Sequence, residues 1–152
     1  MSTSYDEWHA EVRRRIAHQH ASTHLQKAPA HFQAGRFNEG MSELAGAARC
    51  YMMGEVWERA AEVREEMAEH NLSSPYPMGK GNAVLDYQFA ADEWFKHGNA
   101  LKEKGQIEDS CAAYKRTLVD CARAISLDPR SRGGFLISRD TVEKAITDLK
   151  CL

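Results

Sequence analysis

The chain of 152 residues lacks any run of about 18 apolar residues, the length that a membrane-spanning helix needs. Its N-terminus has no apolar core of the kind that secretory signals carry. Neither sign of charge dominates, because 20 lysine and arginine residues stand against 22 aspartate and glutamate residues. No broad field therefore attracts nucleic acid or an acidic membrane surface. We expect a chain that neither inserts into membranes nor binds nucleic acid.

Cysteines are few and scattered, and the four of them form no Cys-x-x-Cys pair. Cys111 and Cys121 fall on one expected helix, about 15 Å apart along its axis at a rise of roughly 1.5 Å per residue, which is too far for a disulfide. Cys50, Cys111 and Cys121 lie on expected apolar helix faces, where an inert buried thiol is typical. We therefore expect reduced cysteines and a cytoplasmic protein.

Patterns that carry catalysis are also missing. Residues 78–82 read MGKGN, without the spacing or the following hydroxyl of a phosphate loop, and no Gly-x-Ser-x-Gly turn occurs. Histidines gather in the first 31 residues, and His20 and His24 lie one helical turn apart, where both can face one metal. The Glu-x-x-His spacing of di-metal helical bundles is absent. We expect no catalytic residue, metal or cofactor; a helical-bundle enzyme or metal-binding protein that uses this His-rich segment is the alternative.

Signals for β-strands are nearly absent. Valine and isoleucine are few, no stretch alternates cleanly between apolar and polar, and good helix formers fill most segments. Apolar residues instead recur every three or four positions, as on one face of a helix. The pattern predicts an all-α protein, with Pro29 ending or kinking the first helix. The expected helices are six, at about 5–27, 38–53, 55–70, 83–104, 107–127 and from about 140 onward.

The clearest loop is the segment 71–82, NLSSPYPMGKGN, which contains two prolines and two glycines. It separates two sub-blocks, 4–70 and 83–152, each near the lower size limit for independent stability. We therefore expect a single all-helical domain over residues 1–152.

The most specific pattern lies between residues 91 and 129. Its order is an aromatic residue, two glycines that flank a leucine, a second aromatic residue and a closing Asp-Pro: Trp94, Gly98, Leu101, Gly105, Tyr114, Ala124-Ile125 and Leu127-Asp128-Pro129. This stretch resembles a tetratricopeptide repeat, and residues 47–69 are similar to the related repeats of soluble NSF-attachment proteins. The resemblance implies antiparallel helical hairpins that stack on their neighbours. A plain helical bundle is the alternative, since the same spacing also satisfies simple helix packing.

The expected C-terminal hairpin has a physical rationale. Small residues at the crossing, Gly98 and Ser110, allow close approach of the two helices, and Gly105 ends the first helix because glycine adopts a left-handed conformation cheaply. Seven residues more than the repeat pattern allows stand between Tyr114 and Ala124. We therefore expect an extended second helix, longer by about 10 Å, that projects past its partner.

The resemblance implies a non-enzymatic adaptor or scaffold that binds a protein or peptide in a groove. Some members of the family grip a carboxylate with Lys and Asn from their first helices. Here Asn99 matches the position of such an Asn, although Phe95 stands where those members have a lysine. Phe95, Lys96, Asn99 and Lys102 on helix 83–104, with Tyr76 in the preceding loop, are our candidate contacts. A structural subunit of a larger assembly and self-association are further alternatives.

Overall fold

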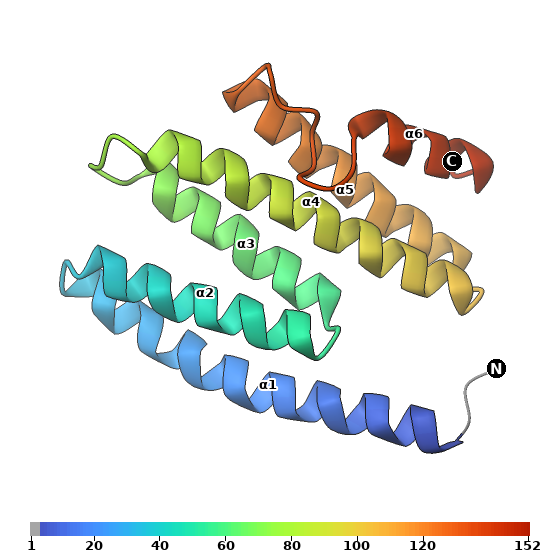
Figure 1. Cartoon of the computed structure of the whole chain (residues 1–152), viewed down its shortest axis with the longest axis horizontal. Coiled ribbons are helices and arrows are strands. Elements are labelled where there is room, and N and C mark those ends of the chain that lie inside the picture. The colour runs from blue at the N-terminus through green and yellow to red at the C-terminus, as the bar shows by residue number, and fades with distance from the viewer. Residues whose placement is uncertain (1–3) are drawn as a thin grey trace. The chain divides into compact units, whose positions relative to one another are not determined.

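The computed structural model describes residues 4–152, and over that range it contains α-helices and no β-strand (Figure 1). The all-α class is confirmed. None of these helices is both long enough and apolar enough to cross a membrane. The elements are six helices: α1 (Ser4–Gln33), α2 (Phe37–Met53), α3 (Trp57–Leu72), α4 (Gly79–Glu103), α5 (Ile107–Leu127) and α6 (Arg139–Asp148).

The chain divides into two compact units, Met1–Val63 and Arg64–Leu152, and the division falls within α3. The loop 71–82 lies inside the second unit. The side-chain amide of Asn71 donates a hydrogen bond of 2.6 Å to Asp86 across that loop, so its two ends are joined. Each unit is described below by itself.

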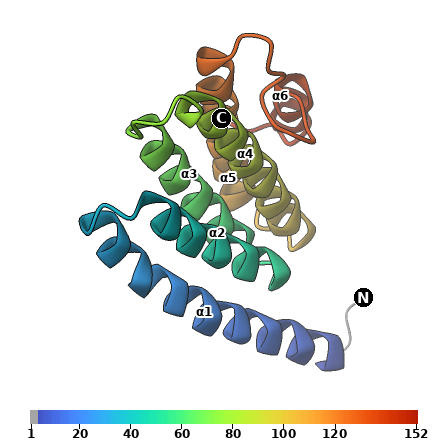
Figure 2. The ribbon, with the colours of Figure 1, turned by 60° about the vertical axis from the view of Figure 1, so that its left-hand side comes forward.

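In the first unit, α1 and α2 run side by side in opposite directions (Figures 1 and 2). Glycines allow the close approach. A Cβ atom added at Gly40 would lie 2.7 Å from the ring of Phe32, and one added at Gly54 would lie 2.4 Å from the Cβ atom of Ala17. Neither position has room for a larger residue.

The first helix does not end at Pro29, which was one of the two outcomes that we had expected, because α1 continues through this residue to Gln33. Proline removes one backbone donor and crowds the preceding turn. Packing on both sides holds this turn in place: Ala28 is only 1 % exposed, and Phe32 covers Gly40. The chain reverses at Gly35, whose φ of +76° is readily adopted by glycine.

The α1 helix is the longer of this pair. Gly54, directly after α2, packs on Ala17 and on the carbonyl of Arg13. Residues 4–12 of α1 therefore run on past the end of α2 (Figure 1).

In the second unit, α4 and α5 form a hairpin that turns at Gly105, with φ +77°. The predicted crossing at Gly98 is confirmed, because a Cβ atom there would lie 2.6 Å from the ring of Tyr114. Ser110 donates its hydroxyl to the carbonyl of Gly98 at 2.7 Å. Small residues therefore bring the two backbones together, as the sequence indicated.

The predicted bounds of α5, 107–127, are confirmed, so the helix is long. It does not project past its partner, because α4 has 25 residues and begins at Gly79. Part of the expected loop thus forms the first turn of α4. Leu127, at the end of α5, packs against a cluster that contains Ala83, Val84 and Tyr87 of α4.

The segment after α5 is tied to α4 by one buried carboxylate. Asp92 accepts backbone hydrogen bonds from Leu136 at 2.8 Å and from Ile137 at 3.2 Å. α6 then starts with Ser138 as its N-cap, which accepts from the backbone N–H of Thr141. The helix thus begins slightly before the expected position of about 140, and Asp140 lies in its first turn.

Candidate protein-binding groove and buried carboxylates

A groove of about 290 Å³ lies between α4 and α5. Its α4 members are spaced by three and four residues, so they share one face of that helix. The floor is mostly apolar and the rim carries an imidazole, a carboxylate and a guanidinium. The lining residues are Trp94, His97, Leu101, Asp109, Ala112, Ala113 and Arg116.

Trp94 is the largest side chain in this groove and is 6 % exposed. The guanidinium carbon of Arg116 lies 4.4 Å from the centre of its ring system, which is a cation–π contact. The indole Nε1 is buried, and it has no hydrogen-bond partner within residues 4–152. A buried donor without a partner costs free energy, so this indole N–H is a local cost to the packing of α4 on α5.

Two of the residues predicted from the sequence, Phe95 and Asn99, both contact Tyr114 of α5 inside the hairpin. The ring of Phe95 lies 5.3 Å from that of Tyr114, and the Tyr114 hydroxyl donates to the side-chain oxygen of Asn99. Both residues are half-buried. One oxygen of Asn99 is thus already used to hold α4 against α5.

The remaining predicted contacts are spread along α4. Burial raises the pKa of both Asp92 and Glu93. The positive charge of nearby Lys96 acts in the opposite direction on both carboxyls, but its effect is smaller. Lys102 is exposed in the last turn. Tyr76 precedes the first turn, so about 35 Å of helix separates it from Lys102 at 1.5 Å per residue. None of the five lines the groove, and their role as a binding face stays a prediction.

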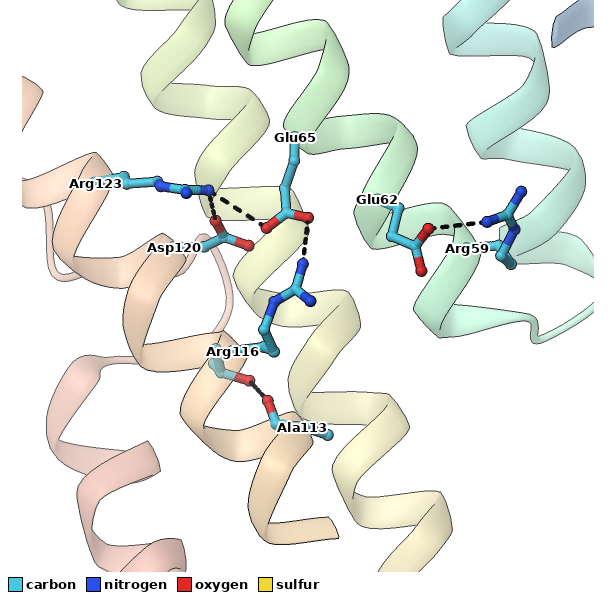
Figure 3. Close-up of polar contacts among 8 residues, drawn as sticks. Arg59, Glu62, Glu65, Ala113, Arg116, Asp120 and Arg123 are labelled. Atoms are coloured by element: carbon cyan, nitrogen blue, oxygen red, sulfur yellow. Dashed lines mark hydrogen bonds and ion pairs between the residues drawn. The ribbon is translucent and has the colours of Figure 1, made fainter. Parts of the chain in front are cut away.

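A cluster of two buried carboxyls and two half-exposed arginines joins α3 to α5 (Figure 3). Glu65 of α3 is 9 % exposed and Asp120 of α5 is fully buried. Arg116 donates to Glu65 at 3.0 Å. Arg123 lies 3.6 Å from Glu65 and 3.2 Å from Asp120. In Figure 3 the Glu65 carboxylate sits between the two arginines, with Asp120 beside it.

We infer that the two carboxyls of this cluster share one proton. Oδ2 of Asp120 and Oε2 of Glu65 are both buried, and neither has a hydrogen-bond partner within residues 4–152. Burial first, and then the hydrogen bond and charge of Glu65, raise the pKa of Asp120 to about 9. Asp120 is therefore protonated at neutral pH and donates its proton to Glu65.

Two further acidic groups of this unit are also poised near neutrality. Burial raises the pKa of Glu93 to about 7, although Arg64 lies 3.5 Å away. Burial likewise raises the pKa of Asp86 to about 6, against the hydrogen bond from Asn71. These carboxyls stabilise contacts between helices, since their partners come from α3.

Sequence analysis missed the buried cluster. A signal for it is present: Asp120 follows Thr117 by three residues and precedes Ala124 by four, so it falls on the buried face of α5. No comparable signal marks Glu65, because acidic residues surround it on both sides in the sequence.

The histidines of α1 do not form a metal site in the described part of the chain. Within residues 4–152, no group of three or more His, Cys, Asp and Glu side chains is placed to hold a metal ion. Nδ1 of His24 lies 2.8 Å from a carboxylate oxygen of Glu43, and the His24 ring covers Gly46. His20 lines a separate groove.

The cysteines depart from expectation in one respect. Cys111 and Cys151 form a disulfide, so the prediction of reduced thiols is wrong for these two in the structure. The reason is that Cys151, just beyond α6, returns to the side of α5, which the sequence spacing does not reveal. Burial raises the pKa of Cys121 to about 12, which agrees with an inert thiol. Cys50 is half-exposed rather than buried.

No protein-family model, curated protein or solved structure matches this chain.

Proposed function

We propose that the chain is a non-enzymatic protein-binding module that docks a segment of another protein in the groove between α4 and α5. The groove itself carries the proposal. Leu101, Ala112 and Ala113 provide an apolar floor, Trp94 adds its ring, and Arg116 brings a half-exposed guanidinium to the edge. Apolar anchoring with polar groups at the edge is the usual anatomy of such a site.

The volume of about 290 Å³ indicates the size of the occupant. It lies at the lower limit of pockets that enclose small ligands, which span roughly 300–1,000 Å³. One or two side chains of a peptide fit this space better than a whole cofactor. Because Arg116 is a donor whose side chain is half exposed, the partner segment should offer carbonyl or carboxylate oxygens next to an apolar side chain.

The resemblance to tetratricopeptide repeats supports the same function, because such repeats are usually scaffolds for other proteins. The close packing of Gly98 on Tyr114 is what such a hairpin requires. A cytoplasmic location remains part of the proposal. There, reducing conditions would act against the Cys111–Cys151 disulfide.

A matched pair of variants tests the groove, once a partner has been captured with the full chain and identified. Ala112 and Ala122 are both exposed on α5, and only Ala112 lines the groove. Ala112→Glu places a charge in the groove and should weaken partner binding at least about tenfold, or about 1.4 kcal/mol. Ala122→Glu carries the same change on the same helix and should bind like the parent in isothermal titration calorimetry.

A second variant tests the face predicted from the sequence. The double variant Lys96→Glu/Lys102→Glu reverses two charges on α4. If it weakens partner binding steeply and Ala112→Glu has no effect, the binding site lies on the lysine face of α4 instead of in the groove. That loss should shrink near 1 M salt, where the Debye length is about 3 Å. Unchanged affinity in both variants would refute a site on this hairpin.

A further inference from the structure

α1 carries an exposed apolar stripe in its N-terminal half. Tyr5 is 67 % exposed, Trp8 60 % and Ile16 46 %. Val12, between them, is half-buried. The spacing of three, four and four residues places these side chains on one face of the helix.

This stripe is not the face that packs on α2. The buried residues of α1 are Ala17, Ala21 and Ala28, which at about 100° per residue lie on the far side of the helix from Tyr5, Trp8 and Val12, with Ile16 between the two faces. α1 thus has two apolar faces, and only one of them is covered. Large side chains form the exposed face, whereas small ones form the buried face.

Apolar surface continues from the stripe onto the end of α2. A groove of about 260 Å³ is lined by Arg13, Ile16, Ala17 and His20 of α1 and by Cys50, Met53 and Gly54 at the end of α2. Met53 is 72 % exposed. The stripe and this groove together make a contiguous apolar surface, of the kind that marks an interaction site.

We propose that a second copy of this chain docks on this surface, with the two α1 helices antiparallel about a two-fold axis. The stripe is self-complementary in that arrangement. An axis near residue 10 places Tyr5 opposite Ile16 of the second copy, and Trp8 opposite its Val12. Each layer then pairs an aromatic with an aliphatic side chain, and the same patch serves both copies, as a two-fold interface requires.

Charges beside the stripe select the antiparallel direction. Asp6 and Arg13 lie on the same flank of α1, two helical turns apart and on either side of the axis. Antiparallel pairing brings Asp6 of one copy beside Arg13 of the other. Parallel two-fold pairing would instead place these flanks on opposite sides of the interface, so Asp6 and Arg13 of the two copies would not meet. Arg13 is available for this contact, since its side chain is 55 % exposed and lies 3.9 Å from Glu55 in an exposed ion pair.

The area predicts a weak dimer. A fully covered aromatic side chain buries about 150–250 Å². With 67 % and 60 % exposure, Tyr5 and Trp8 offer roughly 100–150 Å² each, and with Ile16 and Met53 the surface reaches roughly 400 Å² per copy. The total of about 800 Å² is below that of stable complexes. Dimerisation should therefore be weak and depend on concentration.

Sedimentation equilibrium of the full chain between about 1 µM and 1 mM tests the proposal over the range of weak dimers. A Cys50→Ser background excludes cross-linking through this half-exposed thiol. The average mass should rise from that of one chain toward that of two. Trp8→Glu should raise the Kd by about 30-fold or more, the effect of losing a central tryptophan. Gln19→Glu, an exposed change one turn beyond the stripe, should leave the Kd unchanged.

Charge reversal tests the orientation. Arg13→Asp alone and Asp6→Arg alone should each weaken the dimer, and the double variant should restore it, because the pair is regenerated with its signs exchanged. A chain that stays monomeric to 1 mM would overturn the proposal. So would a dimer that Trp8→Glu leaves intact. Absence of rescue in the double variant would overturn the antiparallel arrangement.

Discussion

The proton shared by Glu65 and Asp120 should make the stability of the second unit fall as pH rises through neutrality. The perturbation that isolates it is Asp120→Asn. Asparagine has nearly the same shape, and its amide can donate to Glu65 as the protonated carboxyl does. The variant therefore keeps the contact between α3 and α5 and removes the titration.

The sign follows from proton counts. Asp120 has a pKa of 3.8 in the unfolded chain and about 9 in the folded one. Between these values the folded state holds one proton more than the unfolded state. Its stabilising contribution is therefore complete below pH 3.8 and is lost as pH rises toward about 9. One proton corresponds to about 1.4 kcal/mol per pH unit, so the loss between pH 6 and 8 is about 3 kcal/mol.

Urea unfolding, followed by circular dichroism at a series of pH values, measures this effect. A loss of about 3 kcal/mol is large against the 5–15 kcal/mol of a typical domain. Glu93 adds a slope of the same sign up to about pH 7, because its pKa is raised to about 7. The difference between parent and Asp120→Asn cancels that contribution. We expect the variant to gain about 3 kcal/mol relative to the parent from pH 6 to 8.

An exposed aspartate provides the control. Hydrogen bonds from Arg130 lower the pKa of Asp128, so this group is ionised in both states above pH 5. Asp128→Asn should leave the pH dependence unchanged. If the parent and Asp120→Asn show the same slope between pH 6 and 8, Asp120 is ionised in the folded protein, and the shared proton is refuted.

Two further predictions concern the same unit. Gly98→Leu should destabilise the protein by about 1–3 kcal/mol through overpacking against Tyr114, although leucine favours helix by roughly 0.8 kcal/mol; chemical denaturation with equal or greater stability would contradict the crossing at Gly98. Cys151→Ser should lower stability by about 3–4 kcal/mol under oxidising conditions, the loop-closure estimate for a separation of 40 residues from Cys111. Adding a dithiol should lower the parent to the level of this variant, and a parent that does not respond would count against the disulfide.

Local signals predicted much of the fold. The bounds of α5 and the turn at Gly105 follow from helix periodicity and from the backbone freedom of glycine. The start of α4 at Gly79 was missed, because Gly and Pro near a helix start resemble a loop when read alone. Pro29 was misjudged for a related reason: the contacts that hold its turn come from α2, which is distant in sequence.

Prediction of the site was less complete, because its contacts join residues far apart in the chain. The residues of the α4 face were chosen from spacing along one helix, whereas the groove also needs α5. Glu65 and Asp120 are 55 positions apart, as the sequence numbering gives directly. Their effect on each other's protonation arises only when α3 and α5 pack. A burial pattern can mark Asp120, but it cannot identify the partner that shares the proton.

Arg116 connects the groove to the buried cluster. The same guanidinium donates to Glu65 and covers the ring of Trp94. The side chain of Arg116 is 50 % exposed and that of Glu65 is 11 % exposed, so this partly buried ion pair orients the guanidinium. The rim of the groove is therefore set by a contact from α3, rather than by α4 and α5 alone. Arg123 instead donates to Asp120 at 3.2 Å and does not line the groove, so Arg116 is the residue through which α3 reaches its rim.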